Sequence, residues 1–184
     1  MEVKDTYIIG RDGSYLNVND ITVYDGKFYA ATSSGVYYAD CDNENLADYS
    51  QWRRDNTMIH VSINYSEIET FNDELLANYS ENKYGTDTLF FFNGENWDYF
   101  DKSSHAIKRD IKVQDNRLLL VEHYSVKVLN KNHSTILDAY TDLEPFAATY
   151  DKNENVYWIG DRNNSLIKMY PDKTREDIIF NGPY

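Results

Sequence analysis

The chain is poor in several features that define large classes of protein. It has one cysteine, Cys41, among 184 residues, which excludes an internal disulfide and any zinc site built from several cysteines. Its longest uninterrupted apolar run, residues 89–92, is far shorter than the roughly 20 residues that span a bilayer. Residues 1–5, MEVKD, lack the cationic and apolar segments of a secretory signal. We therefore expect no transmembrane helix, and either a cytoplasmic protein or a signal that lies outside this sequence.

Basic residues are also few. Lysine and arginine number 18 against 31 aspartate and glutamate residues, which gives a formal net charge of −13. Because the basic residues are scattered among acidic ones, we expect no nucleic-acid groove and no attraction to anionic membranes. Hydrophobic residues make up 41% of the chain and aromatic residues 15%, too much for a disordered acidic tail. A folded domain with an apolar core is the consequence.

The aromatic residues indicate β-structure. The 17 Tyr, 8 Phe and 3 Trp fall in short runs of about four to six residues separated by turn residues, which is the pattern of strands. Five glycine turns separate such runs, at residues 12–13, 25–26, 34–35, 93–94 and 181–182. The sequence predicts a nearly all-β protein, with short helical turns only near residues 43–48 and 103–109.

A repeat sets the predicted fold. Turn-plus-apolar units occur at residues 25–32, 72–79, 115–122 and 153–160. A large apolar residue follows each turn by about two dozen residues, at Trp52, Trp97, Ile136 and Ile178. We interpret each unit as a four-stranded meander of the size of a β-propeller blade. The predicted blades are residues 16–55, 58–101, 105–141 and 144–181. The fold class is therefore all-β, a β-propeller of about four four-stranded blades.

The blades are predicted to differ from centre to rim. Residues 118–121 and 89–92 are apolar on both faces, as expected for strands between neighbouring blades. The predicted fourth strands mix charge with one large apolar residue and belong at the rim, where a polar edge resists aggregation. We expect Trp52 and Trp97 to be equivalent rim-strand residues whose rings pack inward.

The chain ends are similar to one another. Residues 5–10 resemble residues 176–180, so 5–10 is predicted to be an outer strand of a preceding or last blade. Four blades and a surplus outer strand indicate a segment of a larger propeller of six to eight blades, or of a longer chain. The alternative is a closed four-bladed ring with a frayed first strand. An incomplete ring would leave open blade edges, and we expect it to self-associate through them.

One part of the chain resembles a known family. Residues 19–38, NDITVYDGKFYAATSSGVYY, resemble the first blade of the PorZ-type β-propeller proteins of Bacteroidetes. Residues 45–53, NLADYSQWR, and the NGP at 181–183 are similar too. The specific part of this resemblance covers about residues 19–53.

The fourth unit resembles a second type of propeller. Residues 151–160, ending in VYWIG, are similar to the blade motif of two-component regulator propellers in the same bacteria. The unit departs from that motif where Glu154 replaces the usual turn glycine and Asp161 the usual threonine. The second and third units resemble either type only in general pattern.

The resemblance implies an extracellular or periplasmic protein at the cell surface. PorZ-type proteins work at the outer membrane with the type IX secretion system, where they handle an anionic lipopolysaccharide and attach cargo to it. They carry two propellers and a C-terminal sorting domain. This chain supplies about half of one propeller, so the full activity does not carry over, and no catalytic motif comes with the family.

Few residues form a pattern typical of chemistry. The histidines are His60, His105, His123 and His133, and none has the spacing of a metal site. Residues 40–44 and 151–155 imitate the first half of a calcium loop but lack its glycine and its final glutamate, so we interpret them as turns. Glu67 and Glu69 carry no specific glycosidase signal. We therefore expect no catalytic residues, no metal and no cofactor, and the ligand-binding residues stay unassigned.

The functional hypothesis is a non-enzymatic propeller scaffold that binds a protein partner or a surface glycan such as lipopolysaccharide. Tyrosine and tryptophan rings stack on sugars, although in a sheet most of them fill the core. The first alternative is the extracellular sensor propeller of a hybrid two-component system. The second is a propeller glycosidase or lyase.

Overall fold

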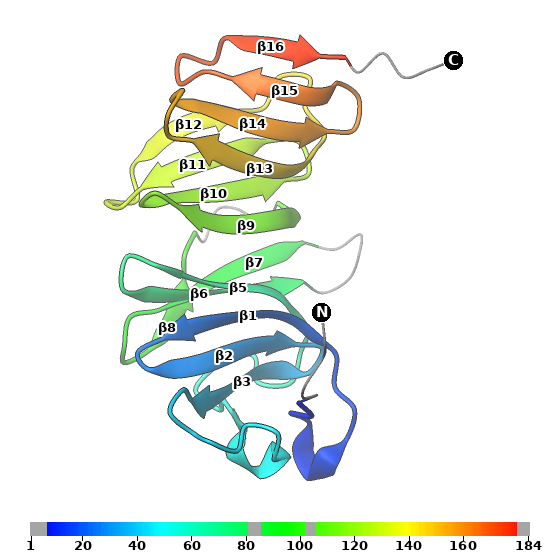
Figure 1. Cartoon of the computed structure of the whole chain (residues 1–184), viewed down its shortest axis with the longest axis vertical. Helices are drawn as coiled ribbons and strands as arrows, with labels where there is room; N and C mark the ends of the chain where they lie inside the picture. The colour runs from blue at the N-terminus through cyan, green and yellow to red at the C-terminus, as the bar shows by residue number, and fades with distance from the viewer. Residues whose placement is uncertain (1–6, 81–85, 102–105, 180–184) are drawn as a thin grey trace. The chain divides into compact units, whose positions relative to one another are not determined.

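The computed structural model describes residues 7–80, 86–101 and 106–179. Within these ranges the chain forms sixteen strands in four sheets and two 3₁₀ turns, with no α-helix (Figure 1). Each sheet is an antiparallel meander whose four strands follow one another in chain order. Such a meander is the blade of a β-propeller, so the predicted fold class is confirmed.

The strands have the following bounds. Sheet 1 contains β1 (Val18–Tyr24), β2 (Lys27–Thr32), β3 (Gly35–Asp40) and β4 (Arg53–Arg54). Sheet 2 contains β5 (Tyr65–Phe71), β6 (Glu74–Ser80), β7 (Asp87–Phe92) and β8 (Trp97–Tyr99). Sheet 3 contains β9 (Lys108–Gln114), β10 (Arg117–Glu122), β11 (Val126–Asn130) and β12 (Thr135–Ala139). Sheet 4 contains β13 (Pro145–Asp151), β14 (Val156–Asp161), β15 (Ser165–Met169) and β16 (Arg175–Ile178).

The turn between the first and second strands recurs with one backbone geometry in the first three sheets. Both turn residues have positive φ, a requirement of the two-residue turn that matches the twist of a hairpin. The pairs are Asp25 and Gly26, Asn72 and Asp73, and Asp115 and Asn116. Aspartate and asparagine tolerate this left-handed conformation better than other side chains. The turns that defined the repeat in the sequence are thus hairpin turns.

The first strand of every sheet carries a β-bulge at the same place. In sheet 1, Val18 pairs with Thr32 and Asp20 with Ala31, so the ladder skips Asn19. The corresponding skipped residues in the other sheets are Ser66, Arg109 and Phe146. A bulge releases its residue from the alternation of the sheet and re-aims its side chain.

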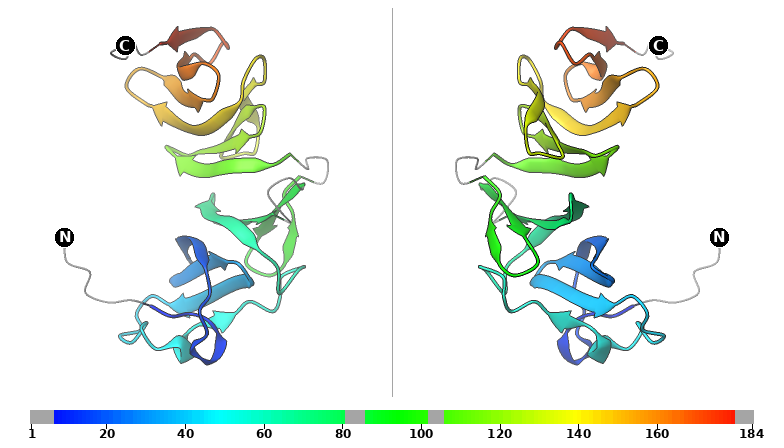
Figure 2. Two further views of the ribbon diagram at one scale, coloured as in Figure 1. Left: turned by 90° about the vertical axis from the view of Figure 1, so that its right-hand side faces the viewer. Right: turned by 90° about the vertical axis from the view of Figure 1, so that its left-hand side faces the viewer.

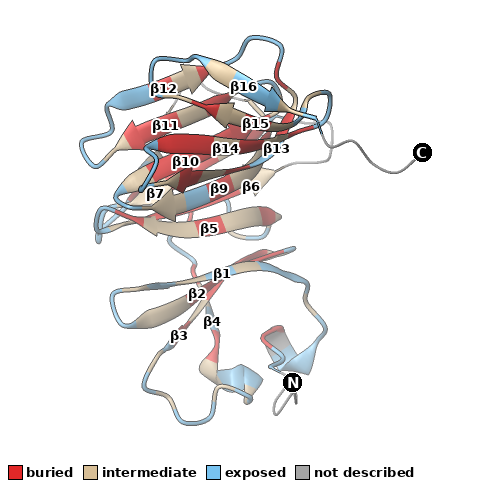
Figure 3. Ribbon diagram, turned by 45° about the horizontal axis from the view of Figure 1, so that its top comes forward, coloured by how far each residue is buried: buried red, intermediate tan, exposed pale blue. Residues whose placement is uncertain are grey.

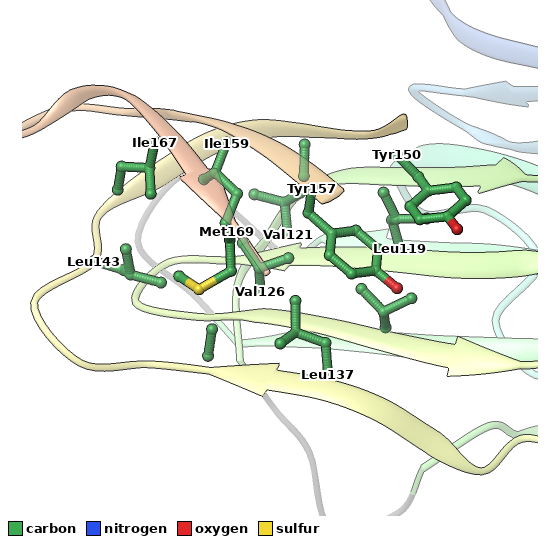
Figure 4. Close-up of a cluster of buried hydrophobic side chains, with 13 residues drawn as sticks. Leu119, Val121, Val126, Leu137, Leu143, Tyr150, Tyr157, Ile159, Ile167 and Met169 are labelled. Carbon is green, nitrogen blue, oxygen red and sulfur yellow. The ribbon is translucent and has the colours of Figure 1, made fainter. Parts of the chain in front are cut away.

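The chain divides into two compact units, Met1–His105 with sheets 1 and 2 and Ala106–Tyr184 with sheets 3 and 4. Within each unit the two sheets lie face to face (Figure 2). The core of the first unit is rich in aromatic rings, among them Tyr29, Tyr65, Phe90 and Trp97. The core of the second unit is mostly aliphatic (Figure 4), with Leu119, Val128, Ile159 and Ile167 fully buried.

The second strands are mostly buried and the fourth strands are largely exposed or half-buried, as predicted, whereas the first strand β1 is exposed or half-buried throughout. Residues 118–121 are at most 4% exposed, and the second strands β10 and β14 are largely buried (Figure 3). The fourth strands β12 and β16 are mostly exposed or half-buried. Exposed charges on these strands are typical of protected sheet edges.

Both predicted tryptophans are buried, but only Trp97 lies in a fourth strand; Trp52 directly precedes β4 and packs on the side of sheet 1 that Ile9 covers. Trp52 ends the 3₁₀ turn Tyr49–Gln51, is 9% exposed, and donates its indole N–H to the carbonyl of Leu46 at 3.0 Å. Trp97 in β8 is 7% exposed and donates to the Asp55 carboxylate at 3.1 Å. Both indoles are therefore packed and hydrogen-bonded in the first unit.

The third repeat marker, Ile136, was assigned one residue too early. A bulge in β12 lets Leu129 pair with Thr135 and Val128 with Leu137, so Ile136 is the extra residue. Ile136 is 37% exposed, whereas Leu137 is 1% exposed. Because side chains alternate between the faces of a strand, a slip of one residue exchanges the buried and exposed positions.

The outer strand predicted at residues 5–10 is also wrong over the part that the structure describes. Residues 7–9 lie outside any strand, and the chain turns at Gly10 into the 3₁₀ turn Arg11–Gly13. Ile9 is instead 5% exposed and packs on the outer side of sheet 1 against Ala30, Tyr37 and Trp52. This segment therefore covers one face of sheet 1, a role that an apolar strand pattern does not distinguish from a rim strand.

The predicted helical turns are only partly present. Residues 43–48 form turns without a helix, and a 3₁₀ turn follows at Tyr49–Gln51. Lys108 and Arg109 already belong to β9, and residues 103–105 lie outside the described residues. Ring closure and self-association through blade edges stay predictions.

Candidate ligand-binding groove

The candidate site lies on loops at one end of sheets 3 and 4. Neighbouring strands of a meander run in opposite directions. The beginnings of the first and third strands and the ends of the second and fourth strands therefore lie at the same end of the sheet, which we call the start end. Three loops of the second unit meet there: residues 123–125, 140–144 and 162–164. Loops held on a rigid sheet are where propellers and other scaffolds place binding residues.

The loop at 140–144, which joins β12 to β13, is held in place along its length. Leu143 is 4% exposed and packs in the core between sheets 3 and 4 (Figure 4). The Asn164 side-chain amide donates to the carbonyl of Asp142 at 3.0 Å, and Arg175 donates to the carbonyl of Thr141 at 3.2 Å. The loop is therefore fixed before any ligand arrives, which reduces the entropy cost of binding.

Two hollows lie on either side of this loop, and we call them together the Tyr140 groove. The first has a volume of about 430 Å³ and is lined by Tyr124, Tyr140, Asp142, Leu143, Glu144, Asn163 and Asn164. The second has a volume of about 390 Å³ and shares Tyr140, Asp142 and Leu143 with the first; Asp138, Ala139, Thr141, Met169, Lys173 and Arg175 complete it. The groove thus combines apolar rings with amides and charges of both signs.

Two tyrosines stand out from the surface of the groove. Tyr124 is 65% exposed and Tyr140 is 66% exposed. The ring of Tyr124 lies 4.1 Å from that of His123, and the Lys173 ammonium lies 6.0 Å from the centroid of the Tyr140 ring. Neighbouring groups therefore hold both rings while leaving one face of each available for contact with a flat apolar ligand surface.

A cluster of charges borders the first hollow. The Glu144 carboxylate accepts from Arg162 at 3.0 Å and from Arg109 at 3.3 Å, and His123 Nε2 lies 4.0 Å from it. The hydrogen bond from Arg162, helped by that from Arg109, lowers the pKa of Glu144. Glu144 is therefore an ionised acceptor at neutral pH rather than a proton donor.

Asp161 shapes the neighbouring turn, and this explains its departure from the propeller motif. Its carboxylate accepts from the backbone N–H groups of Glu144 at 2.6 Å and of Asn163 and Asn164 at 2.9 Å each. Burial alone would raise the pKa of Asp161, but these hydrogen bonds outweigh it and lower the pKa below its usual value.

Thr32 has the equivalent position at the end of β2. Its hydroxyl accepts from the N–H of Ser34 at 3.1 Å and donates to the carbonyl of Gly35 at 2.6 Å. Asp161 thus takes the turn-forming role of the threonine and adds a bond to Glu144, the residue directly before the first strand of its own sheet.

The bulged residues connect neighbouring sheets within each unit. Arg109 donates to the carbonyl of Pro145 at 2.9 Å, at the start of β13. Asn19 donates in the same way to the carbonyl of Tyr65 at 2.6 Å, at the start of β5. The bulge thereby aligns adjacent sheets and, in the second unit, brings Arg109 to Glu144 at the groove.

The residues singled out in the sequence lie elsewhere, apart from His123. His60 packs near the rings of Tyr79 and Phe90, and His133 lies in the turn between β11 and β12. His105 is outside the described residues. Among the residues that the structure does describe, no three His, Cys, Asp or Glu side chains are grouped so as to hold a metal ion.

The two calcium-like segments are turns. The Asp151 carboxylate accepts from the N–H groups of Asn153 at 2.8 Å and Glu154 at 3.3 Å, and the side chain of Asn43 accepts from the N–H of Asn45 at 2.9 Å. These are Asx turns, in which an acidic or amide side chain imitates the next backbone carbonyl. The side-chain oxygens of Asp151 and Asn43 that form these turns are therefore engaged by their own backbone.

No motif in the sequence predicted the groove. Its residues come from three loops on two sheets, and no local motif joins them. The one usable signal was that Tyr124 and Tyr140 each follow a strand and precede polar turn residues, unlike the tyrosines inside the strand runs.

Comparison of the sequence with protein-family models gives no match, and comparison with curated proteins gives none either. The structure is similar to those of solved β-propeller proteins. PorZ, a surface component of the type IX secretion system of Porphyromonas gingivalis, is 10% identical over 96% of this chain with a TM-score of 0.65. The extracellular domain of the hybrid two component system BT3049 from B. thetaiotaomicron is 15% identical over 97%, with a TM-score of 0.64.

The WD40 β-propeller domain of Doa1 gives a TM-score of 0.63 at 15% identity over 96% of this chain. The chain spans 22% of the PorZ chain, 24% of the BT3049 chain and 58% of the Doa1 chain. These structures include both propeller types that the sequence resembles. At such low identity the likeness establishes the fold, a β-propeller. No helix in the described ranges has the length and apolarity to cross a membrane.

Proposed function

We propose that this chain is a non-enzymatic propeller scaffold of the cell surface that binds a glycan in the Tyr140 groove. The observation that carries the proposal is the pair of tyrosines, both about two-thirds exposed, one in the prearranged loop 140–144 and one in the loop 123–125. A tyrosine ring buries the apolar face of a sugar while amides and carboxylates bind its hydroxyls. Asn163, Asn164 and Glu144 supply such groups in the same hollow.

The state of Glu144 supports binding over hydrolysis. A glycosidase needs one carboxylic acid with a raised pKa that protonates the leaving oxygen, opposite a second carboxylate. The pKa of Glu144 is lowered by its arginine partners. The carboxylate of Asp161 is likewise ionised and is engaged by backbone N–H groups. The enzyme alternative would be supported instead by product release from a polysaccharide.

Location at the cell surface is supported by the proteins of similar fold. PorZ is described as a bacterial surface component, and BT3049 contributes an extracellular domain. The similarity to the extracellular domain of BT3049 supports the sensor function as an alternative. The sequence on either side of this chain separates the two: a transmembrane helix and kinase domain favour the sensor, a second propeller and sorting domain the secretion role.

The test is a binding screen of the purified chain against bacterial surface polysaccharides and plant glycans. We expect Tyr124→Ala and Tyr140→Ala each to weaken binding about tenfold or more, since each removes a stacking surface worth more than about 1.4 kcal/mol. Tyr15→Ala is the matched control, because Tyr15 is 92% exposed and belongs to the other unit. Equal affinities for all three variants, or appearance of cleaved product, contradict the proposal.

A further inference from the structure

Another hollow, in the first unit, contains Arg54, which has no counter-ion among the described residues. The hollow is lined in part by residues of β3 and β4 of sheet 1 and has a volume of about 390 Å³. It is lined by Asp12, Tyr37, Tyr49, Ser50, Trp52, Arg54 and Asn56. It shares no residue with the Tyr140 groove, which belongs to the other unit.

Hydroxyl groups hold the Arg54 guanidinium in place. Nε and Nη2 donate to the Tyr37 hydroxyl at 3.0 and 2.7 Å, and Nη1 donates to the Ser62 hydroxyl at 3.0 Å. Nη2 also lies 3.5 Å from the Ser34 hydroxyl. Tyr37 is itself 4% exposed and packs in the core. The guanidinium is therefore fixed in direction by neutral partners on a rigid support.

Arg54 has no ion-pair partner in the part of the chain that the structure describes. Within residues 7–80, 86–101 and 106–179, no aspartate or glutamate forms an ion pair with Arg54. The adjacent carboxylate of Asp55 binds the hydroxyl of Thr57 and the indole of Trp97 instead. In a chain with 31 acidic residues a partner is easily supplied, so its absence at a half-buried arginine is informative.

The same position in the other sheets is filled differently. Arg54 pairs with Tyr37 across β3 and β4. The equivalent pairs are Tyr99 with Phe90 in sheet 2 and Asp138 with Lys127 in sheet 3. In sheet 4 the position holds Asp177, which forms an ion pair with Arg175 at 3.3 Å. The unpaired charge of Arg54 is thus a departure from the repeat and not a requirement of the blade.

We infer that this hollow binds a hydroxylated ligand of monosaccharide size through a carboxylate group that pairs with Arg54. Guanidinium groups bind carboxylates by charge-assisted hydrogen bonds, and Nη1 donates one of its two N–H groups within the protein and keeps the other for a ligand. The Tyr49 ring, 43% exposed, forms a wall for the apolar side of the ligand, and Ser50 and Asn56 supply groups for its hydroxyls.

The test uses glucuronate as the probe, with glucose and acetate as the two partial ligands. Calorimetry reports affinity, and the indole N–H signal of Trp52, assigned with Trp52→Phe, reports the site. We expect glucuronate to bind and to shift that signal, and glucose and acetate to bind at least tenfold more weakly. Arg54→Gln, which keeps a donor for Tyr37, should weaken glucuronate at least tenfold.

Two controls make the result decisive. Arg53→Gln removes an equal charge from an exposed side chain of the same strand and should leave the affinity unchanged. Tyr49→Ala should weaken glucuronate but not acetate, and serves if Arg54→Gln does not fold. Tyr124→Ala should change nothing here, so this inference and the Tyr140 groove fail separately. Absence of glucuronate binding, binding that survives Arg54→Gln, or acetate binding as tight as glucuronate would each overturn the inference.

Discussion

The two units of this chain have the same topology but are stabilised by different chemistry. The first unit packs rings between its sheets: Tyr29, Phe90 and Trp97 belong to one buried cluster, and Tyr24 and Tyr38 pack against it. The second unit packs branched aliphatic side chains in the equivalent space. The bulged position follows the same division: Asn19 makes neutral hydrogen bonds, whereas Arg109 joins a charged cluster. The blade thus specifies hydrogen-bond geometry and burial, and leaves the identity of the packing groups open.

The largest expected effect on stability comes from truncating one buried side chain in the core of each unit. Trp97→Ala should lower the free energy of unfolding by about 3–5 kcal/mol, because it leaves a large cavity. It also removes the indole N–H that binds Asp55. Leu119→Ala, the matched aliphatic truncation in the second unit, should cost about 2–5 kcal/mol. Urea unfolding measures both. Losses below 1 kcal/mol would show that these cores collapse around the missing group.

The second effect concerns the equivalent turn positions Asp161 and Thr32. At neutral pH, Asp161→Thr should cost about 1–2 kcal/mol, the value of a lost side-chain cap. Because the pKa of Asp161 is lowered in the folded chain, its contribution is present above the usual value of 3.8 and is lost as the pH falls below it. The difference between wild type and variant should therefore shrink in acid.

Melting temperatures of both proteins at pH 7, 4 and 3 provide the measurement. Thr32→Ser is the control, since it alters the same turn position in the first unit without a titrating group. A gap between Asp161→Thr and wild type that is constant across this pH range would be inconsistent with the role given to the carboxylate.

A smaller effect separates the neutral and charged bulges. Asn19→Ala should cost about 1 kcal/mol, a typical net value for neutral hydrogen bonds, and the cost should not depend on salt. The cost of Arg109→Met should fall as sodium chloride is raised towards 1 M, because salt screens charges that are partly exposed. Unfolding in low and high salt checks both variants. Equal salt dependence of the two would remove this distinction between the units.

The smallest effect on stability is expected in the groove. Tyr124 and Tyr140 are about two-thirds exposed, so the double alanine variant should change the free energy of unfolding by no more than about 0.5 kcal/mol. Thermal unfolding and the glycan screen, run on the same preparation, test this together. A large loss of stability would mean that the rings support the fold and are not reserved for a ligand.

Local signals carried most of the fold prediction. The Asp25 and Gly26 turn needs two residues of positive φ, and the sequence displays that requirement directly. A bulge has no such marker, so Ile136 was taken for the buried residue in place of Leu137. The apolar residues around Ile9 were equally compatible with a rim strand and with a cover over sheet 1, and only tertiary packing distinguishes these.

The sites were harder to predict than the fold. Arg53 and Arg54 form a charged pair that is typical of a rim strand. Only the positions of its neighbours show that Arg54 has no counter-ion among the described residues. The Tyr140 groove likewise depends on loops from two sheets meeting at one end. Binding positions that join distant segments leave no local periodicity in a single sequence.

The bulge in the first strand of each sheet has a consequence for how such repeats diversify. Asn19, Ser66, Arg109 and Phe146 differ in size, charge and polarity, yet the ladders on either side keep one register. A residue outside the ladder is exempt from the inward and outward alternation that constrains its neighbours. Each blade therefore brings one position where a substitution can create a new contact without shifting the strand register, and propeller design can vary that position first.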